Sequence, residues 1–247
     1  MFTPDQRESL RATLVAAARA DPRITGAALT GSAARDGEDE WSDIDLAFGV
    51  GDAAHLRDTL DDWTKRMVED HEAVATFDVG RGNAIYRVFF LRNTLQVDLA
   101  FFPASEFGAL APTFRLLFGE SVELPWVPSP SAESLIGMAW LHAIHARSCI
   151  KRGKRWQAEY MVSTVRDHVL GLAALRLGLP AVEGRGMDQL PLEITKPLEG
   201  ALVRALDAGE LSRAFAVAVA GLLSEVRAVD HLLAARLERP LAELTAP

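Results

Sequence analysis

The chain has 247 residues, of which 49% are hydrophobic and 24% charged, and this composition excludes a disordered or fibrous protein. Its net charge of −8 is concentrated in the first half, which holds 21 acidic and 12 basic residues up to Pro125. Because non-specific binding to nucleic acid depends on Lys and Arg neutralising phosphates, we expect no nucleic-acid partner, and a template-directed polymerase is disfavoured.

The first half predicts an α/β domain with a mixed sheet, spanning residues 1–125. Thr3-Pro4-Asp5-Gln6 has the spacing of a capping box, and it predicts a helix that ends at Asp21-Pro22. A second helix is expected over 52–69, and Arg92-Asn93-Thr94 is expected to be a tight hairpin turn. The expected strands are Ile24–Leu29, Ile44–Phe48, Ala73–Val79, Ala84–Leu91 and Leu95–Phe102.

The second half, residues 126–247, predicts an all-helical bundle. Around Pro125, Pro128 and Pro130 the hydrophobic period changes from 2 to 3.6, which indicates a linker. Four helices are expected: from Ser131 to about Arg152, then Trp156–Leu177, Glu193–Asp207 and Leu211–Arg239.

Neither a membrane span nor a secretory signal is expected. The longest stretches without charge or proline, such as Ala214–Leu223, are about half the roughly 20 residues of a spanning helix. The first residues lack the basic start and apolar run of a signal peptide. Cys149 is the single cysteine, which fits a reducing compartment, and we interpret it as a small buried residue on a helix. We therefore expect a cytoplasmic protein.

The pattern that carries chemistry is Asp43-Ile44-Asp45, twelve residues after Gly31. On a strand, residues i and i+2 point to the same side, so Asp43 and Asp45 place two carboxylates side by side. Such a pair is unfavourable unless a cation lies between the carboxylates, and oxygen ligands of this kind suit Mg²⁺ or Mn²⁺.

A third carboxylate, Asp98, interrupts the apolar strand Leu95–Phe102. If that strand lies beside the Asp45 strand, three carboxylates converge, as a two-metal site for phosphoryl transfer requires. Gly31-Ser32 is expected to form a strand-to-helix turn whose backbone N–H groups approach a phosphate closely. Three isolated structural aspartates, each a cap or an edge carboxylate facing water, are the weaker alternative.

Gly31-Ser32, Asp43-Ile44-Asp45 and Asp98 together resemble the signature of the DNA polymerase beta-like nucleotidyltransferase superfamily. Within it, the chain resembles the small bacterial enzymes that attach a nucleotide to antibiotics such as aminoglycosides and lincosamides. The resemblance covers about residues 24–102, and an α/β domain followed by a helical domain is similar to the two-domain members.

This resemblance implies that Asp43, Asp45 and Asp98 hold two Mg²⁺ or Mn²⁺ ions. It implies that Gly31 and Ser32 contact the triphosphate of ATP or another nucleoside triphosphate. Asp98 would also take the proton from the acceptor hydroxyl, and the expected product is the acceptor carrying a nucleoside monophosphate, AMP for ATP.

Further basic residues are candidates for contact with the triphosphate. Arg35 follows Gly31-Ser32 in the first half. Five cations lie within nine residues of the second half, and the helical domain of similar enzymes often supplies basic residues to the nucleotide; these are Arg147, Lys151, Arg152, Lys154 and Arg155. The alternative for the cluster is a solvated helix end whose cations offset the helix dipole.

Glu159 is the second candidate for the general base, because some antibiotic nucleotidyltransferases draw this base from a glutamate of the helical domain. For Trp156 and Tyr160, one helical turn apart, we favour core packing over stacking on a base or an acceptor.

Histidines and acidic runs receive structural interpretations. His142 and His145 lack a third ligand at suitable spacing, so we interpret them as partly buried and hydrogen-bonded. The acidic run Glu38-Asp39-Glu40 is interpreted as a solvated face.

The sequence therefore predicts a metal-dependent nucleotidyltransferase acting on a hydroxyl of a small molecule, with the site in a cleft between the two domains. The partners are a nucleoside triphosphate and that acceptor, and both a monomer and a homodimer remain open. Two alternatives stay open as well: modification of a protein or RNA partner, as in toxin–antitoxin pairs, and a non-catalytic nucleotide-binding regulator.

Overall fold

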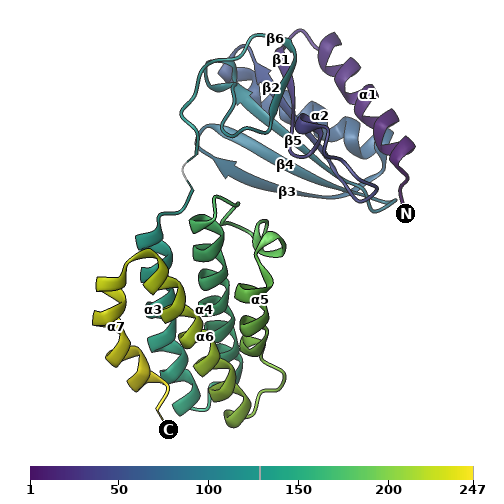
Figure 1. Cartoon of the computed structure of the whole chain (residues 1–247). Helices are drawn as coiled ribbons and strands as arrows, with labels where there is room; N and C mark the ends of the chain where they lie inside the picture. The colour runs from purple at the N-terminus through teal and green to yellow at the C-terminus, as the bar shows by residue number, and fades with distance from the viewer. Residues whose placement is uncertain (128, 247) are drawn as a thin grey trace. The chain divides into compact units, whose positions relative to one another are not determined.

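The computed structural model of the chain describes residues 1–127 and 129–246, which form two compact units (Figure 1). The first unit is Met1–Val127 and the second comprises the residues from 128 onward. Pro128, in the expected linker, lies outside the described residues. None of the described helices is both long and apolar enough to cross a membrane.

The first unit is built on a six-stranded mixed sheet with the order β3-β4-β5-β2-β1-β6 (Figure 1). β2 pairs with β5 in parallel, and the other pairs are antiparallel. The strands are β1 Ile24–Thr30, β2 Ile44–Val50, β3 Ala73–Arg81, β4 Ala84–Leu91, β5 Gln96–Pro103 and β6 Phe114–Gly119. Together with the helical second unit, this arrangement confirms the predicted fold class.

β6 was not predicted from the sequence. It pairs only with β1, and its residues are half-buried or exposed, so it lacks the alternation of buried and exposed residues that marks a strand. An edge strand of this kind is recognisable only once its neighbour in the sheet is known.

Two helices, α1 Pro4–Ala20 and α2 Leu56–His71, supply the side chains that cover one face of the sheet. The capping box at Thr3 is present as predicted. The core beneath the helices centres on Phe48, Trp63 and Phe101, whose ring centroids lie 4.8 to 6.1 Å apart.

Strand alternation divides β2 and β5 between the two faces of the sheet. Ile44, Leu46 and Phe48 of β2, and Val97, Leu99 and Phe101 of β5, belong to the core under α1 and α2. Ala47 and Ala100 belong to a separate cluster on the other face. Asp45 and Asp98 share the alternation of these alanines, so their side chains lie on the face away from the helices.

The predicted hairpin at Arg92-Asn93-Thr94 is confirmed. It joins β4 to its antiparallel neighbour β5, the N–H of Leu91 donates to the carbonyl of Leu95 at 2.9 Å, and Thr94 has φ +73°. This turn sets the register between β4 and β5, in which Val88 is the partner of Asp98.

The junction between α1 and β1 makes a testable contribution to stability. Arg23 donates from Nε and Nη2 to the Asp21 carboxylate at 2.9 and 2.8 Å, and Trp63 Nε1 donates to it at 3.2 Å. The hydrogen bonds from the Arg23 side chain are the main reason that the pKa of Asp21 is lowered.

We expect Asp21→Asn to lower the free energy of unfolding at pH 7 by about 1–3 kcal/mol, because it removes a charge-assisted network. A lowered carboxyl pKa stabilises the fold above the unfolded value near 4, and this stabilisation is lost as pH falls through the folded value. Urea unfolding at pH 7 and pH 3 measures the effect. An equal loss at both pH values would show that the charge of Asp21 does not stabilise the junction.

The second unit is helical, with α3 Ala132–Lys151, α4 Arg155–Arg176, α5 Leu192–Leu198, α6 Ala208–Val229 and α7 His231–Leu244 (Figure 1). Cys149 is buried on α3, as predicted. The predictions for α3 and α4 are correct within a few residues, because both helices carry clear apolar stripes.

Two of the helix predictions are wrong. The expected helix Glu193–Asp207 ends at Leu198, with a 3₁₀ turn over Glu199–Ala201, and Asp207 instead caps α6. The expected single helix Leu211–Arg239 is two helices. Asp230 is extended, and its carboxylate accepts the N–H groups of Leu232 and Leu233, so it starts α7.

Candidate active site

Three aspartates converge at one end of β2 and β5. Asp43 directly precedes β2, Asp45 is its second residue, and Asp98 is the direct partner of Asp45 in the parallel pairing of β2 with β5. One oxygen from each carboxylate lies within 4.8 Å of the others. The predicted convergence is confirmed, with the difference that Asp43 lies one residue before the strand.

The surroundings of Asp98 disfavour its charged form. Burial raises the pKa of Asp98, and the negative charge of Asp43 raises it further. The side-chain amide of Gln96 opposes this by donating to both Asp98 oxygens, at 3.0 and 3.2 Å. The cluster thus concentrates negative charge at a partly buried place, where a cation would relieve the repulsion.

The donor set fits a divalent metal. Three half-buried carboxylates offer oxygen ligands alone, which suit Mg²⁺ or Mn²⁺ better than the softer transition metals. Within residues 1–127 and 129–246, no other group of three or more His, Cys, Asp or Glu side chains is close enough to share an ion. Asp43, Asp45 and Asp98 are therefore the described residues that could hold a divalent ion.

The turn after β1 lies against this cluster. Gly31 has φ +59°, and a Cβ added there would collide with the carboxylate of Asp45 and lie 2.7 Å from its Cγ. Glycine is thus required both by the backbone conformation and by the close approach of Asp45. The expected proximity of this turn to the aspartates is present for Gly31 and Asp45.

The expected helix after Gly31-Ser32 is absent from this segment. Ser32 leads into a single 3₁₀ turn, Ala33–Arg35, and Asp36 then takes a left-handed conformation. One turn has no helix dipole of useful size, so the argument for phosphate binding through a helix N-terminus fails here. The close backbone approach at Gly31 remains.

Arg115, which was not predicted as a site residue, stabilises one of the loops of the site. Arg115 of β6 donates to the carbonyl of Ala33 at 2.8 Å and pairs with Asp36 at 2.7 Å, which fixes the turn after Gly31. The prediction missed this contact because it missed β6.

The loop before Asp43 is anchored to α1. Arg7 is buried and donates to the carbonyls of Asp39 and Ser42 at 2.5 and 3.0 Å, while Arg11 pairs with Glu38 at 2.6 Å. The interpretation of Glu38 as part of a solvated face is therefore wrong. A signal was present, since Arg7 and Arg11 are four residues apart on one helix face and match the acidic run in charge.

The other predicted site residues are one residue of the first unit and four residues of the helical unit. Arg35 is exposed on the 3₁₀ turn. Lys151 ends α3, Lys154 precedes α4, Arg155 is its first residue, and all three are exposed. Glu159 is half-buried and accepts a hydrogen bond from Ser163 at 2.8 Å. These last four belong to the helical unit, so their part in a nucleotide site remains a prediction.

The packing interpretation of Trp156 and Tyr160 is wrong. Their exposed fractions are 76% and 61%. The buried stripe of α4 instead contains Ala158, Val162 and Val165. Trp156 and Tyr160 each lie two residues before a member of this stripe, and two residues correspond to more than half a helical turn, so their side chains point away from it.

His142 is half-buried and its ring stacks on that of His168, with centroids 5.5 Å apart. Nδ1 of each ring contacts a backbone carbonyl one turn earlier, at 2.6 Å for His142 and 2.7 Å for His168. The interpretation of His142 as partly buried and hydrogen-bonded is confirmed, whereas the expected partial burial of His145 is wrong, because His145 is exposed on α3.

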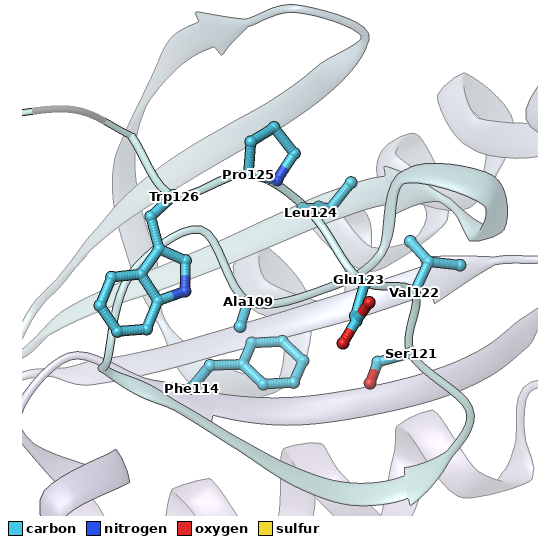
Figure 2. A pocket seen from close by; sticks show the side chains of 8 residues that line it. All are labelled: Ala109, Phe114, Ser121, Val122, Glu123, Leu124, Pro125 and Trp126. Carbon is cyan, nitrogen blue, oxygen red and sulfur yellow. The ribbon is translucent and has the colours of Figure 1, made fainter.

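A cavity of about 580 Å³ lies beside β6 (Figure 2). Phe114 at the start of β6 and Trp126 contribute aromatic rings to its wall. The cavity is lined by Ala109, Phe114, Ser121, Val122, Glu123, Leu124, Pro125 and Trp126. None of the three aspartates lines it, so the candidate active site rests on the carboxylate cluster and not on this cavity.

Comparisons with known proteins give similarities to solved structures alone. Neither the models of known protein families nor the curated proteins contain a match to this chain. Among solved structures, the chain is similar to an aminoglycoside 6-adenyltransferase from Bacillus subtilis, with a TM-score of 0.42 and 13% sequence identity. The match covers 98% of each chain. At that identity and TM-score the similarity assigns neither an activity nor a substrate to this chain.

Proposed function

We propose that this protein is a metal-dependent nucleotidyltransferase that transfers a nucleoside monophosphate to a hydroxyl of a small molecule. The observation that carries the proposal is the meeting of Asp43, Asp45 and Asp98 directly against the Gly31 turn. Three converging carboxylates beside a glycine turn provide metal ligands and a place for phosphate in one site.

Each residue has a defined role in this proposal. Asp43, Asp45 and Asp98 would hold one or two Mg²⁺ ions, which supply positive charge to the phosphates and to the developing charge of the reaction. Gly31 allows the backbone to approach the triphosphate, and Ser32 with Arg35 would contact its oxygens. Arg7 and Arg115 hold the two loops of the site in place.

The proposed reaction is an in-line displacement. The acceptor oxygen forms a bond to the α-phosphorus of the nucleoside triphosphate, and the bond from that phosphorus to the β-phosphate oxygen breaks. Pyrophosphate leaves, and the acceptor hydroxyl proton passes to a carboxylate, for which we rank Asp98 before Glu159.

The second part of the proposal is that basic residues of the helical unit contact the triphosphate. Lys151, Lys154 and Arg155 are exposed at the connection between α3 and α4, and their charge suits a triphosphate. ATP is the preferred nucleotide, and an aminoglycoside or lincosamide is the preferred acceptor, on the strength of the resemblance of the motif residues.

The experiment that tests this function is pyrophosphate release from each nucleoside triphosphate with Mg²⁺ against a panel of aminoglycosides and lincosamides. The Asp43→Asn protein is measured alongside. Release that needs an acceptor, Mg²⁺ and Asp43 would support the proposal. Metal-dependent nucleotide binding without release would favour a protein or RNA acceptor or a regulatory role, and release that persists in Asp43→Asn would overturn the metal assignment.

The ranking of the two candidate bases gives a separate prediction. Asp98→Asn is expected to lower kcat by about 10²-fold or more, with a smaller effect on nucleotide affinity, because it removes a proton acceptor as well as a metal ligand. Glu159→Gln is expected to change kcat by less than about tenfold. The measurement is steady-state kinetics with nucleotide binding by calorimetry, and a larger loss in Glu159→Gln would reverse the ranking.

A further inference from the structure

An apolar surface lies on strands β3 and β4, on the same face of the sheet as the aspartates. We define the β3–β4 patch as Phe77, Val79, Val88 and Phe90. Phe89 and Leu91 of β4 are buried in the core under the helices, so Val88 and Phe90, which alternate with them, face the other way. Phe77 pairs with Val88, and Val79 pairs with Tyr86 on this same face.

Three of the four side chains of the patch are strongly exposed. The exposed fractions are 69% for Phe77 and 49% for both Val79 and Phe90. β3 is an outer strand of the sheet, and such strands usually carry charges that discourage association. Contiguous exposed apolar side chains mark binding surfaces.

The charged side chains that the structure describes on this hairpin do not interrupt the patch. Asp78 and Arg87 pair with each other at 2.6 Å, and Arg87 also donates to Thr64 of α2 at 2.6 Å. Their contact with α2 places them on the helix-covered face. On the helix-covered face, Asp78 and Arg87 thus lie beside the buried residues Phe89 and Leu91, and neither charge is on the face that carries the patch.

The strand register connects the patch to the candidate site. Phe77 pairs with Val88, Val88 pairs with Asp98, and Asp98 pairs with Asp45. These residues form one row across four neighbouring strands. With strands about 4.8 Å apart, the backbone of Val88 lies about 5 Å from that of Asp98, and that of Phe77 about 10 Å.

This row places an apolar surface within one small molecule's length of the carboxylate that we rank as the proton acceptor. An acceptor whose hydroxyl lies at Asp98 can therefore extend its apolar part over the patch. Aromatic and aliphatic groups gain by covering Phe77 and Phe90, whereas a uniformly cationic molecule gains less there, because cation–π attraction to an exposed ring is weaker than burial of an apolar group.

We propose that the β3–β4 patch binds the apolar part of the acceptor, so that the substrate class is a hydroxyl compound with an aromatic or aliphatic face next to the reacting hydroxyl. This inference rests on the proposed function and deepens it. It also narrows the proposed acceptor class, because it favours acceptors in which a sugar-like hydroxyl group is joined to an apolar portion over purely polycationic ones such as aminoglycosides.

The test compares two probes that share their hydroxyl groups, phenyl β-D-glucoside and methyl β-D-glucoside. Binding to the full chain with Mg²⁺ and a non-hydrolysable ATP analogue is followed by saturation-transfer NMR titration. We expect the phenyl compound to bind at least about tenfold more tightly than the methyl compound, as burial of an aromatic ring predicts. Equal affinities would overturn the proposal.

Variants locate the binding surface. Phe77→Ser and Val79→Ser are expected to remove most of the preference for the phenyl compound. Val68→Ser is the matched control, because Val68 on α2 is 50% exposed, close to the 49% of Val79, but α2 packs on the other face of the sheet. A preference that survives in Phe77→Ser, or is lost equally in Val68→Ser, would contradict the assignment.

Two further measurements separate the possible failures. Light scattering on wild type and Phe77→Ser reports whether the patch joins two copies of the chain; a dimer that Phe77→Ser converts to a monomer would overturn the acceptor assignment. Metal-dependent ATP binding in Asp43→Asn reports on the proposed function alone. Its persistence would refute the metal site, whereas a missing phenyl preference with normal ATP binding refutes only the patch.

Discussion

The Asp45→Asn protein is expected to lose nucleotidyl transfer by about 10³-fold or more while keeping its fold. Asp45 is the central member of the cluster: it pairs in register with Asp98, follows Asp43 by two residues, and lies against Gly31. An amide has nearly the same shape as a carboxylate but carries no charge, so it weakens metal binding without opening a cavity.

Asp45→Asn should not lower the thermal stability of the metal-free protein, although it lowers the activity. Removing one of three neighbouring negative charges reduces their repulsion, so the melting temperature of Asp45→Asn without metal is expected to equal or exceed that of wild type. Mg²⁺ should raise the melting temperature of wild type and have little effect on the variant, because an ion stabilises only the protein that binds it.

The matched control is Asp58→Asn, which changes an exposed aspartate in the first turn of α2. This variant should retain full transfer and the full Mg²⁺ stabilisation. Pyrophosphate release and thermal unfolding with and without Mg²⁺ give both readings. Transfer by Asp45→Asn at more than about a tenth of the wild-type rate would contradict the role of the cluster.

The strand alternation in the sequence was sufficient to predict on which face of the sheet Asp45 and Asp98 lie. Asp45 and Asp98 each stand between residues that must face the core, so their side chains had to emerge on the other face of a sheet. That the two strands are neighbours was a condition of the argument from the residues, and only the resemblance of the motif supported it. The structure agrees with both expectations, the face of the sheet and the pairing of the two strands.

The supports of the site could not be predicted in the same way. Arg115 fixes the Gly31 turn from a strand whose sequence shows no alternation, and Arg7 reaches the loop before Asp43 across 32 and 35 positions of sequence. Contacts of this kind depend on how distant elements pack, which periodicity and caps do not encode.

Trp156 and Tyr160 show a related limit. Aromatic residues one helical turn apart are usually buried, and here the stripe of small and β-branched residues through Ala158 and Val162 occupies the packing face instead. The neighbouring helices decide which of the two stripes of α4 faces the bundle. Here α4 packs on α3 and α6 through its small and β-branched residues.

Gly31→Ala is expected to reduce transfer by about 10²-fold, and Gly82→Ala to leave transfer unchanged. The two glycines have nearly the same backbone conformation, with φ +59° and +62°. They differ in their surroundings, because a Cβ at Gly31 meets the Asp45 carboxylate and a Cβ at Gly82 meets nothing within 4 Å. The pair therefore separates backbone strain from displacement of a metal ligand.

Both variants should lose a similar amount of stability, about 1–2 kcal/mol, because an L-residue in the left-handed region carries that cost wherever it lies. The collision at Gly31 is with the end of a side chain, which can rotate away, so it adds little to the loss of stability. The rotated Asp45 carboxylate no longer points toward Asp43 and Asp98, and a displacement of about 1 Å suffices to lower catalysis by two orders of magnitude.

Urea unfolding and pyrophosphate release on the two variants measure these effects. Equal losses of activity would show that strain in the fold, and not the position of Asp45, is what the glycine protects. A large loss of activity in Gly31→Ala alone, with matched losses of stability, would identify the contact between the Gly31 backbone and the Asp45 carboxylate as the reason that this turn needs glycine.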